Sequence, residues 1–273
     1  MTASKAGEVL VRSANHDYYD SPGVAEYFGS YKSDLFKAEE FIFDSLKEQL
    51  ADHPILEIGI GGGRITRHLA LLTKDYIGVD SSDTMVEFCR RRFSDLTLLV
   101  CDARNMSCFK SEQFNAVIFG YNGIDEVGPY DRALILKEIN RILKTNGTFI
   151  FSSHNLDWAG IPACFLEGCF SWGGMSKLTN NLLCFWIYTY GLWTHMLTRA
   201  RRKGDAVFLE YESSPGVALP VYYVNKEAQI RKLRESGFTD VSAISFDGTL
   251  LNNENRRKHF MVFYVARKNE SAH

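Results

Sequence analysis

The chain has 273 residues, of which 45% are hydrophobic, and a formal net charge of −2 at pH 7. This length and composition describe an ordinary globular protein with one large α/β domain or two small ones. The charge balance lacks the overall basic excess typical of nucleic-acid binding, so we expect no nucleic-acid partner.

The six cysteines form no C-x-x-C pair and do not cluster with histidines. This spacing predicts no metal site, and it favours reduced thiols over disulfides. Residues 1–10 contain no apolar run of the length that a signal peptide needs. We therefore expect a cytoplasmic protein without a bound metal.

A tyrosine-rich segment at 13–33 precedes the first predicted helix, at 34–50. Apolar residues at helical spacing, such as Leu35, Ala38 and Ile42, predict this helix. Pro54 interrupts the helical pattern and immediately precedes the first predicted strand.

From residue 55 the pattern alternates between strands and helices. Runs such as 116–119 suit strands that are buried on both faces. The β-α-β-α order predicts a parallel, doubly wound sheet whose ligand lies at the carboxyl ends of the strands. Strands are predicted at 55–58, 76–79, 97–101, 115–120 and 147–152, and helices at 62–73, 83–93 and 131–143.

The alternation breaks after residue 153 and resumes with a helix at 225–236 and strands at 241–246 and 260–266. The last strand follows its predecessor without an intervening helix, so it should run antiparallel. We expect an α/β fold over 1–273 as a single domain: a doubly wound, seven-stranded, mostly parallel sheet with helices on both faces. The long insertion at 154–221 should form a cap after the fifth strand.

The most informative stretch is the glycine turn after the first strand, with glycines at 59, 61, 62 and 63. Such a turn lets the backbone approach a ligand and presents N–H groups at a helix N-terminus. The dinucleotide fingerprint G-x-G-x-x-G/A fits Gly59 and Gly61, but its third position falls on Arg64. The pattern present is Glu57-x-Gly59-x-Gly61-x-Gly63.

This pattern resembles the first motif of the class I S-adenosylmethionine-dependent methyltransferases, which also have seven strands with only the last reversed. Asp80, at the end of the second strand, can accept hydrogen bonds from both hydroxyls of a ribose. Asp102, past the third strand, resembles the family's acid that accepts the adenine amino group, with the next residue's N–H beside the ring. The structural alternatives are a helix N-cap for Asp80 and a turn residue for Asp102.

The resemblance implies S-adenosyl-L-methionine as cofactor and S-adenosyl-L-homocysteine as product. It also implies that the tyrosine-rich segment is a lid, although simple packing on the domain surface is the alternative. Met85 can pack on the adenine or serve in the core. The cofactor contacts expected from the resemblance are Tyr19, Tyr27, Glu57, Gly59, Gly61, Asp80, Ser81, Met85, Asp102, Ala103, Arg104, Phe119 and Tyr121.

Four residues are candidates for catalysis on the acceptor side. His154, directly after the fifth strand, is the best-placed imidazole for a general base. Asp125 and Glu126 can orient an acceptor amine or remove a proton, or they can be helix-entry acids. The hydroxyl of Tyr222 can bond the substrate as the chain re-enters the fold.

Within the cap, 177–203 is predicted to be one helix whose apolar stretch at 182–193 precedes basic residues. We favour a helix packed over the acceptor site, with its basic end matching the helix dipole. Peripheral membrane contact through 182–203 is the alternative. The apolar stretch is too short to span a bilayer.

The predicted activity is transfer of a methyl group by in-line displacement to an amine or hydroxyl of a small molecule, such as a metabolite, sugar or natural-product intermediate. The alternatives are an NAD-dependent oxidoreductase, which Arg64 and Asp102 argue against, and a cofactor-binding protein without transfer activity. The sequence leaves the acceptor, the choice between N- and O-transfer and the oligomeric state open.

Overall fold

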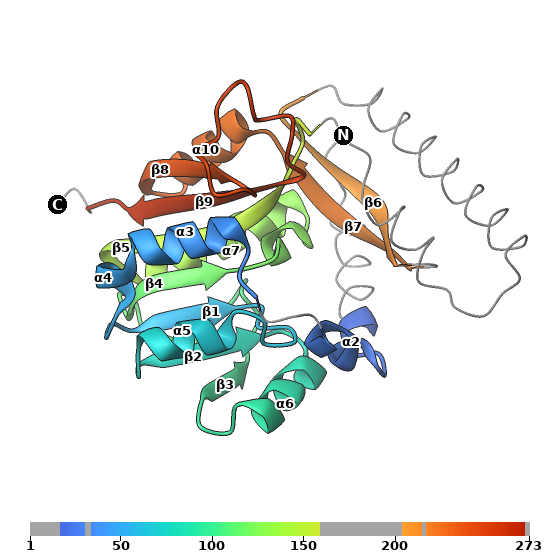
Figure 1. The fold of residues 1–273 in the computed structure, drawn as a ribbon, viewed down its shortest axis with the longest axis vertical. Helices are drawn as coiled ribbons and strands as arrows, with labels where there is room; N and C mark the ends of the chain where they lie inside the picture. Colours follow the sequence, from blue (N-terminus) through green and yellow to red (C-terminus); the bar gives the residue numbers. More distant parts are fainter. Residues whose placement is uncertain (1–16, 31–33, 159–203, 215–216, 271–273) are drawn as a thin grey trace, which may run out of the picture.

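The structure, a computed structural model, describes residues 17–30, 34–158, 204–214 and 217–270 (Figure 1). The described strands form one sheet in the order β3-β2-β1-β4-β5-β7-β6, and β9 pairs with both β5 and β8. The strands are β1 (Ile55–Ile58), β2 (Tyr76–Asp80), β3 (Thr97–Val100), β4 (Phe114–Phe119), β5 (Leu143–Asn155), β6 (Ala206–Ser214), β7 (Val217–Val224), β8 (Phe238–Ser245) and β9 (Met261–Lys268).

The predicted seven-stranded core is confirmed, and β9, the last of its strands, runs in the opposite direction to the others as expected. Strands β1 to β5 pair in parallel, whereas β9 is antiparallel to both β5 and β8. Two further strands, β6 and β7, form an antiparallel hairpin that the sequence did not predict; it lies at the end of the insertion expected at 154–221 and extends to Val224. The hairpin joins the sheet through a short parallel pairing of Tyr223 and Val224 with the end of β5.

Helices cover both faces of the sheet, as expected for a doubly wound fold (Figure 1). The helices are α2 (Val24–Ser30), α3 (Lys37–Ser45), α4 (Lys47–Leu50), α5 (Thr66–Leu72), α6 (Asp83–Arg92), α7 (Pro129–Ile142) and α10 (Lys226–Glu235), with a 3-10 turn, η1, at Gly123–Asp125. One buried cluster joins the sheet to α3, α5 and α6, and the other joins it to α7 and α10.

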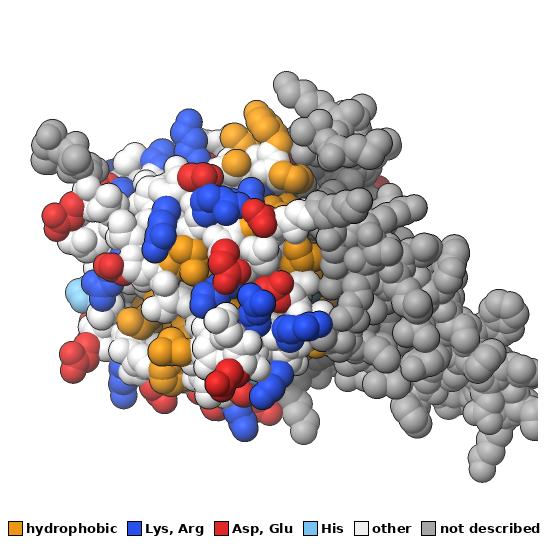
Figure 2. Space-filling model, turned by 90° about the horizontal axis from the view of Figure 1, so that it is seen from above, with side chains coloured by type: hydrophobic (Ala, Val, Ile, Leu, Met, Phe, Trp, Pro, Cys, Tyr) orange, Lys and Arg blue, Asp and Glu red, His pale blue; other side chains and the backbone are white. Residues whose placement is uncertain are grey.

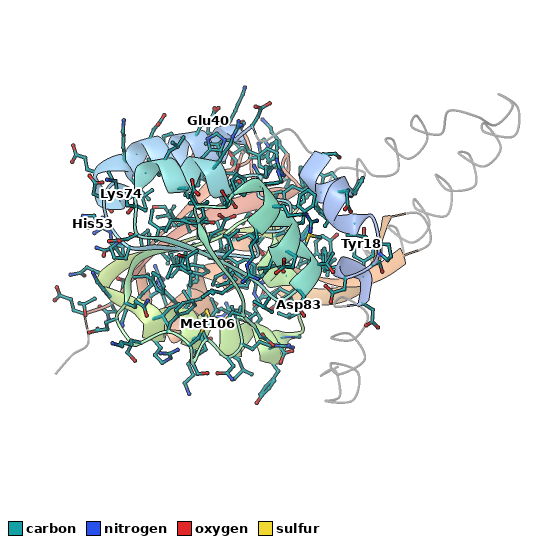
Figure 3. All side chains as sticks on the ribbon, turned by 90° about the horizontal axis from the view of Figure 1, so that it is seen from below. Tyr18, Glu40, His53, Lys74, Asp83 and Met106 are labelled. Carbon is teal, nitrogen blue, oxygen red and sulfur yellow. The ribbon has the colours of Figure 1, made fainter. Side chains whose placement is uncertain are left out.

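The part of the N-terminal segment that is described lies against the start of α6. The Asp20 carboxylate accepts a hydrogen bond of 2.5 Å from the Ser82 hydroxyl, and the same hydroxyl caps α6 by accepting from the Met85 N–H. Figure 3 shows Tyr18 on this segment beside the end of α6 that carries Asp83. This arrangement places the segment at the carboxyl edge of the sheet.

The predicted helix at 177–203 lies outside the described residues, as does most of the predicted cap. Among the helices that the structure describes, none has the length and apolar character needed to cross a membrane.

Candidate active site

A cavity of about 440 Å³ opens at the carboxyl edge of the sheet. Residues that follow β1, β2, β3 and β4 contribute to its wall, together with the N-terminal segment and the start of α7. The predicted residues that line it are Tyr19, Gly59, Gly61, Asp80, Ser81, Met85, Asp102, Ala103, Arg104, Phe119, Tyr121 and Glu126. The structure therefore places twelve of the predicted residues around one cavity.

The glycine turn and Asp80 are tied together. Gly59 and Gly61 have φ angles of 69° and 49°, in the left-handed region that favours glycine. The Gly61 N–H donates to Asp80 Oδ2 at 2.9 Å, and the Ser82 N–H donates to Oδ1 at 3.0 Å. Burial raises the pKa of Asp80, and these backbone hydrogen bonds oppose that rise. Each oxygen accepts one of these bonds, which leaves lone pairs for a ligand.

Arg64, the residue that breaks the dinucleotide fingerprint, connects the turn to α3. Its guanidinium donates to both oxygens of Glu39 at 2.6 Å and lies 4.3 Å from the centre of the Phe36 ring. Arginine suits this bidentate and stacked environment because its planar fork matches a carboxylate. A glycine in place of Arg64, as the dinucleotide fingerprint requires, could make neither the ion pair with Glu39 nor the contact with Phe36.

Asp102 and Arg104 form the wall after β3. Arg104 Nε donates to both carboxylate oxygens of Asp102 at 2.9 Å, and its Nη1 donates to Asp131 at 2.8 Å. Partial burial alone would raise the pKa of Asp102, but the hydrogen bonds from Arg104 hold it below its usual range. The guanidinium thus connects the β3 end to the first turn of α7.

Glu57 stands apart from the cavity, contrary to its expected contact with the cofactor. It is 1% exposed, and its Oε2 accepts a hydrogen bond of 2.5 Å from the Tyr76 hydroxyl on the neighbouring strand. Burial raises the pKa of Glu57 to about 8. The reason for its position is the strand alternation, which turns this side chain into the face shared with Tyr76.

The N-terminal segment closes one side of the cavity through Tyr19 but not through Tyr27. The Tyr19 hydroxyl donates to Glu126, and its ring lies 5.7 Å from that of Phe28. Tyr27 is 52% exposed and is not part of the cavity wall. A Cβ on Gly62 would approach the Phe28 backbone to 2.4 Å, so the turn and this segment are in close contact.

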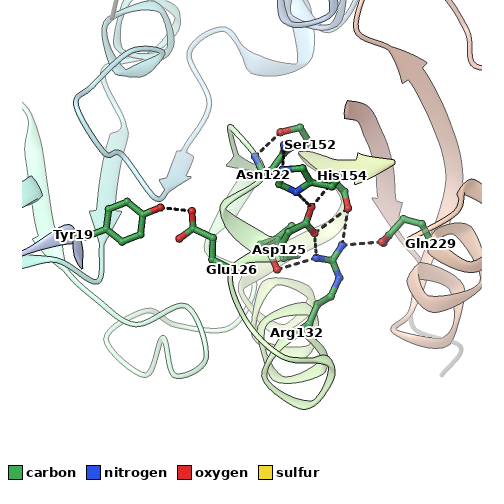
Figure 4. Close-up of polar contacts among 10 residues, drawn as sticks. Tyr19, Asn122, Asp125, Glu126, Arg132, Ser152, His154 and Gln229 are labelled. Carbon is green, nitrogen blue, oxygen red and sulfur yellow. Dashed lines mark hydrogen bonds and ion pairs between the residues drawn. The ribbon is translucent and has the colours of Figure 1, made fainter. Parts of the chain in front are cut away.

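Glu126 and its neighbour Asp125 point to different environments (Figure 4). Glu126 lines the cavity and is half-buried, and this burial raises its pKa to about 7. Asp125 is fully buried behind the cavity wall and forms an ion pair with Arg132. The two adjacent acids therefore have different roles.

Asp125 is the centre of a buried hydrogen-bond network. One oxygen accepts from Arg132 and from the Ser153 hydroxyl, and the other accepts from the His154 backbone N–H at 2.6 Å and from His154 Nδ1 at 2.9 Å. Arg132 also donates to the Ile124 carbonyl and to Gln229 on α10, both at 2.8 Å. The network joins η1, β5, α7 and α10 at one carboxylate.

His154 is oriented by this network, outside the cavity wall. The bond to Asp125 assigns its proton to Nδ1, and Nε2 lies 3.2 Å from the Asn122 amide nitrogen. Asn122 has a left-handed φ of 59°, which is uncommon for a residue with a side chain, and its N–H donates to the Ser152 hydroxyl at 2.8 Å. An acceptor therefore has to displace the Asn122 amide to reach Nε2.

Contrary to the prediction, the Tyr222 side chain is buried in the protein rather than open to an acceptor. It is 2% exposed, and its ring packs 4.8 Å from the guanidinium carbon of Arg132. Arg132 and Gln229 themselves were missed by the sequence analysis. The available signal was the phase of α7, where Arg132 falls on the same buried stripe as Ile135, Leu136 and Ile139.

Within the described ranges, no group of three or more His, Cys, Asp or Glu side chains is placed to hold a metal ion. Chemically, the cavity offers carboxylates at the ends of two adjacent strands, a glycine turn and an aromatic wall. These features suit a nucleoside with a flexible extension.

Residues 55–147 match the model of a protein family described as a methyltransferase domain. A demethylmenaquinone methyltransferase from Thermotoga maritima is 31% identical over 100 residues, which are 35% of this chain and 41% of that protein. The match therefore spans less than half of this curated relative.

Solved structures of methyltransferases share the fold over nearly the whole chain. The 1,6-didemethyltoxoflavin-N1-methyltransferase of Burkholderia thailandensis, with bound S-adenosylhomocysteine, has a TM-score of 0.57 and 12% identity, with 99% of this chain and 92% of that chain covered. The CcbJ methyltransferase of Streptomyces caelestis has a TM-score of 0.58 and 15% identity, with 93% and 98% covered. At such identities the likeness concerns the fold alone.

Proposed function

We propose that this chain, which belongs to the class I S-adenosylmethionine-dependent methyltransferases, transfers a methyl group from that cofactor to an amine or hydroxyl of a small molecule. The observation that carries this proposal is the single cavity that brings Asp80, Asp102 and the turn at Gly59 and Gly61 together.

The cofactor would lie across the strand ends in the order of the sheet. Asp102 and the Ala103 N–H would hold the adenine after β3, with Met85 on its face, and Asp80 would accept the ribose hydroxyls after β2. The turn after β1 and the residues Phe119 and Tyr121 after β4 would hold the methionine part. Neighbouring strands are about 4.8 Å apart, so three intervals give roughly 14 Å, a span that suits an extended nucleoside with its side chain.

The residues present fit this ligand. The Asp80 oxygens keep lone pairs for two hydroxyls. The cofactor supplies an electrophilic methyl group on its sulfonium. The protein's own task is to align the acceptor with that methyl group and to exclude water.

For a hydroxyl acceptor, we propose that His154 removes the proton. Asp125 holds the Nδ1 proton and thereby leaves the lone pair on Nε2, the state that a general base needs. The imidazole side chain is 23% exposed, so an acceptor can reach Nε2 once the Asn122 amide moves aside. A neutral amine acceptor needs no base.

A small-molecule acceptor is favoured over a nucleic acid by the surface charge. On the face drawn in Figure 2, basic and acidic side chains of the described residues are interspersed, and no extended basic area appears among them. The B. thailandensis structure holds a small molecule, 1,6-didemethyltoxoflavin, together with the product cofactor. We place the enzyme in the cytoplasm, in small-molecule biosynthesis.

The test is calorimetric titration of S-adenosylhomocysteine into the wild type and Asp80→Ala. We expect the variant to lose at least about a hundredfold in affinity, since two charge-assisted hydrogen bonds are worth about 1.5–3 kcal/mol each. Asp75→Ala, which removes an exposed carboxylate at the opposite end of β2, is the matched control and should bind normally. Equal affinity of Asp80→Ala and the wild type would refute the site.

A further inference from the structure

We infer that Glu126 makes the cavity discriminate between the positively charged methyl donor and its neutral thioether product. The inference rests on the proposed function, because it assigns a role to Glu126 within the same cavity. It assigns to Glu126 a role in binding selectivity rather than in removing a proton from the acceptor.

Topology places Glu126 near the sulfur of the cofactor. In the proposed arrangement the adenine and ribose would follow β3 and β2, so the sulfur end would reach toward β1 and β4, the next strands in the sheet. Glu126 comes directly after η1, in the connection that leaves β4, and it lines the cavity together with Tyr121 and Gly123. A charge on this carboxylate therefore acts at the end of the cavity where donor and product differ.

The cavity wall carries more negative than positive charge. Four acids line it (Asp80, Asp102, Glu126 and Asp131) against two arginines (Arg64 and Arg104). The Arg64 charge is balanced by Glu39, and Arg104 lies between Asp102 and Asp131. The arginines are thus committed to particular carboxylates, and the remaining field favours a cation in the cavity.

The groups that face Glu126 determine how it responds to such a cation. The Tyr19 hydroxyl donates to it from the N-terminal segment, and the negative charges of Asp80 on β2 and Asp125 on η1 oppose its ionisation. Burial contributes most to a pKa of about 7, so the carboxyl is close to half ionised at neutral pH. A sulfonium nearby favours the carboxylate form, whereas a thioether does not.

The neighbouring Asp125 shows why this role belongs to Glu126. Arg132 neutralises Asp125 behind the wall, where no ligand reaches, and the carboxylate is committed to the His154 network. The two adjacent acids therefore have different roles: Asp125 is ion-paired with Arg132, and Glu126 exchanges a proton near neutral pH.

The inference predicts a pH-dependent preference for the donor. Below pH 6 Glu126 is mostly protonated, so the attraction for the sulfonium weakens, while binding of the product changes much less. One unit of pKa shift corresponds to a tenfold change in relative affinity over the whole titration. With a pKa of about 7 in the free protein, the preference for donor over product should therefore rise about fivefold between pH 6 and pH 8, and a larger shift should bring the rise toward tenfold. At pH 7 donor binding should release about half a proton.

The experiment measures the affinities of S-adenosylmethionine and S-adenosylhomocysteine by calorimetry at pH 6, 7 and 8. Buffers of different ionisation enthalpy at pH 7 give the number of protons released. Glu126→Gln should abolish both the pH dependence of the affinity ratio and the proton release. Glu87→Gln, an exposed carboxylate on α6, is the matched control and should retain both.

Tyr19→Phe provides a second variant that keeps Glu126. Its hydroxyl stabilises the carboxylate, so its loss should move the pH midpoint of the affinity ratio upward. A ratio that does not change with pH in the wild type would overturn the inference, as would a Glu126→Gln protein that keeps the pH dependence. If neither compound binds at any pH, the proposed function itself fails, which distinguishes the two outcomes.

Discussion

Arg132→Met should destabilise the protein strongly, because it leaves a carboxylate charge in the interior without its counterion. Arg132 and Asp125 are 2% and 0% exposed, and Arg132 donates hydrogen bonds to Asp125, Ile124, Ser153 and Gln229. Removing one partner of a buried ion pair costs about 3–5 kcal/mol, mainly because the other charge remains uncompensated. We therefore expect a loss of that size in the free energy of unfolding.

A second substitution tests this reason. In Arg132→Met/Asp125→Asn the remaining side chain is neutral, so the double variant should be more stable than Arg132→Met alone. The control is Arg90→Met, which breaks the ion pair with Glu87 on the surface, where the partners are 44% and 59% exposed. Exposed pairs contribute about 0–1 kcal/mol, so this variant should unfold close to the wild type.

The assay is urea unfolding at pH 7, followed by circular dichroism, for the four proteins at one ionic strength. Activity and cofactor affinity are not needed for this measurement. An Arg132→Met protein within about 1 kcal/mol of the wild type would refute the reasoning. A double variant less stable than the single variant would show that the network depends on the charge of Asp125 itself.

Two further predictions concern Glu57 and His154. Burial raises the pKa of Glu57 to about 8 in the folded chain, against about 4.3 in an unfolded one, so the folded state binds more protons between these values. The free energy of unfolding should therefore fall as pH rises from about 5 to 8. Urea unfolding of Glu57→Gln should show a smaller fall over the same range. An equal fall in both proteins would count against a buried titrating carboxyl. His154→Gln should reduce turnover of a hydroxyl acceptor by about 10²–10⁴-fold. The affinity for S-adenosylhomocysteine should stay unchanged, because His154 is not part of the cavity wall. Full turnover in this variant would show that His154 is not the base.

Much of the fold followed from local patterns. The apolar runs after residue 55 predicted the order of strands and helices, because strands buried on both faces and amphipathic helices have different periods. The observed β5 is longer than predicted, at Leu143–Asn155, and its far end pairs with β7. That pairing is a long-range contact, and no local pattern within the insertion indicated it.

The positions of Asp80 and Asp102 were also predictable. Each acid follows a strand of a parallel sheet, and the carboxyl ends of neighbouring strands meet at one edge. Glu57 shows the limit of this reasoning. It belongs to the same sequence pattern as Gly59 and Gly61, yet the alternation of β1 turns its carboxyl toward Tyr76 instead of the cavity.

The sequence by itself thus determined the doubly wound sheet, the glycine turn and the edge at which acids gather, because these depend on residue spacing along the chain. Only the tertiary structure decided how the adjacent acids Asp125 and Glu126 differ. Their environments are made by Arg132 and Gln229 on one side and by Tyr19 on the other, residues that are remote in sequence from one another. Burial and charge in the folded chain, rather than residue type, assign one acid to the His154 network and the other to the cavity.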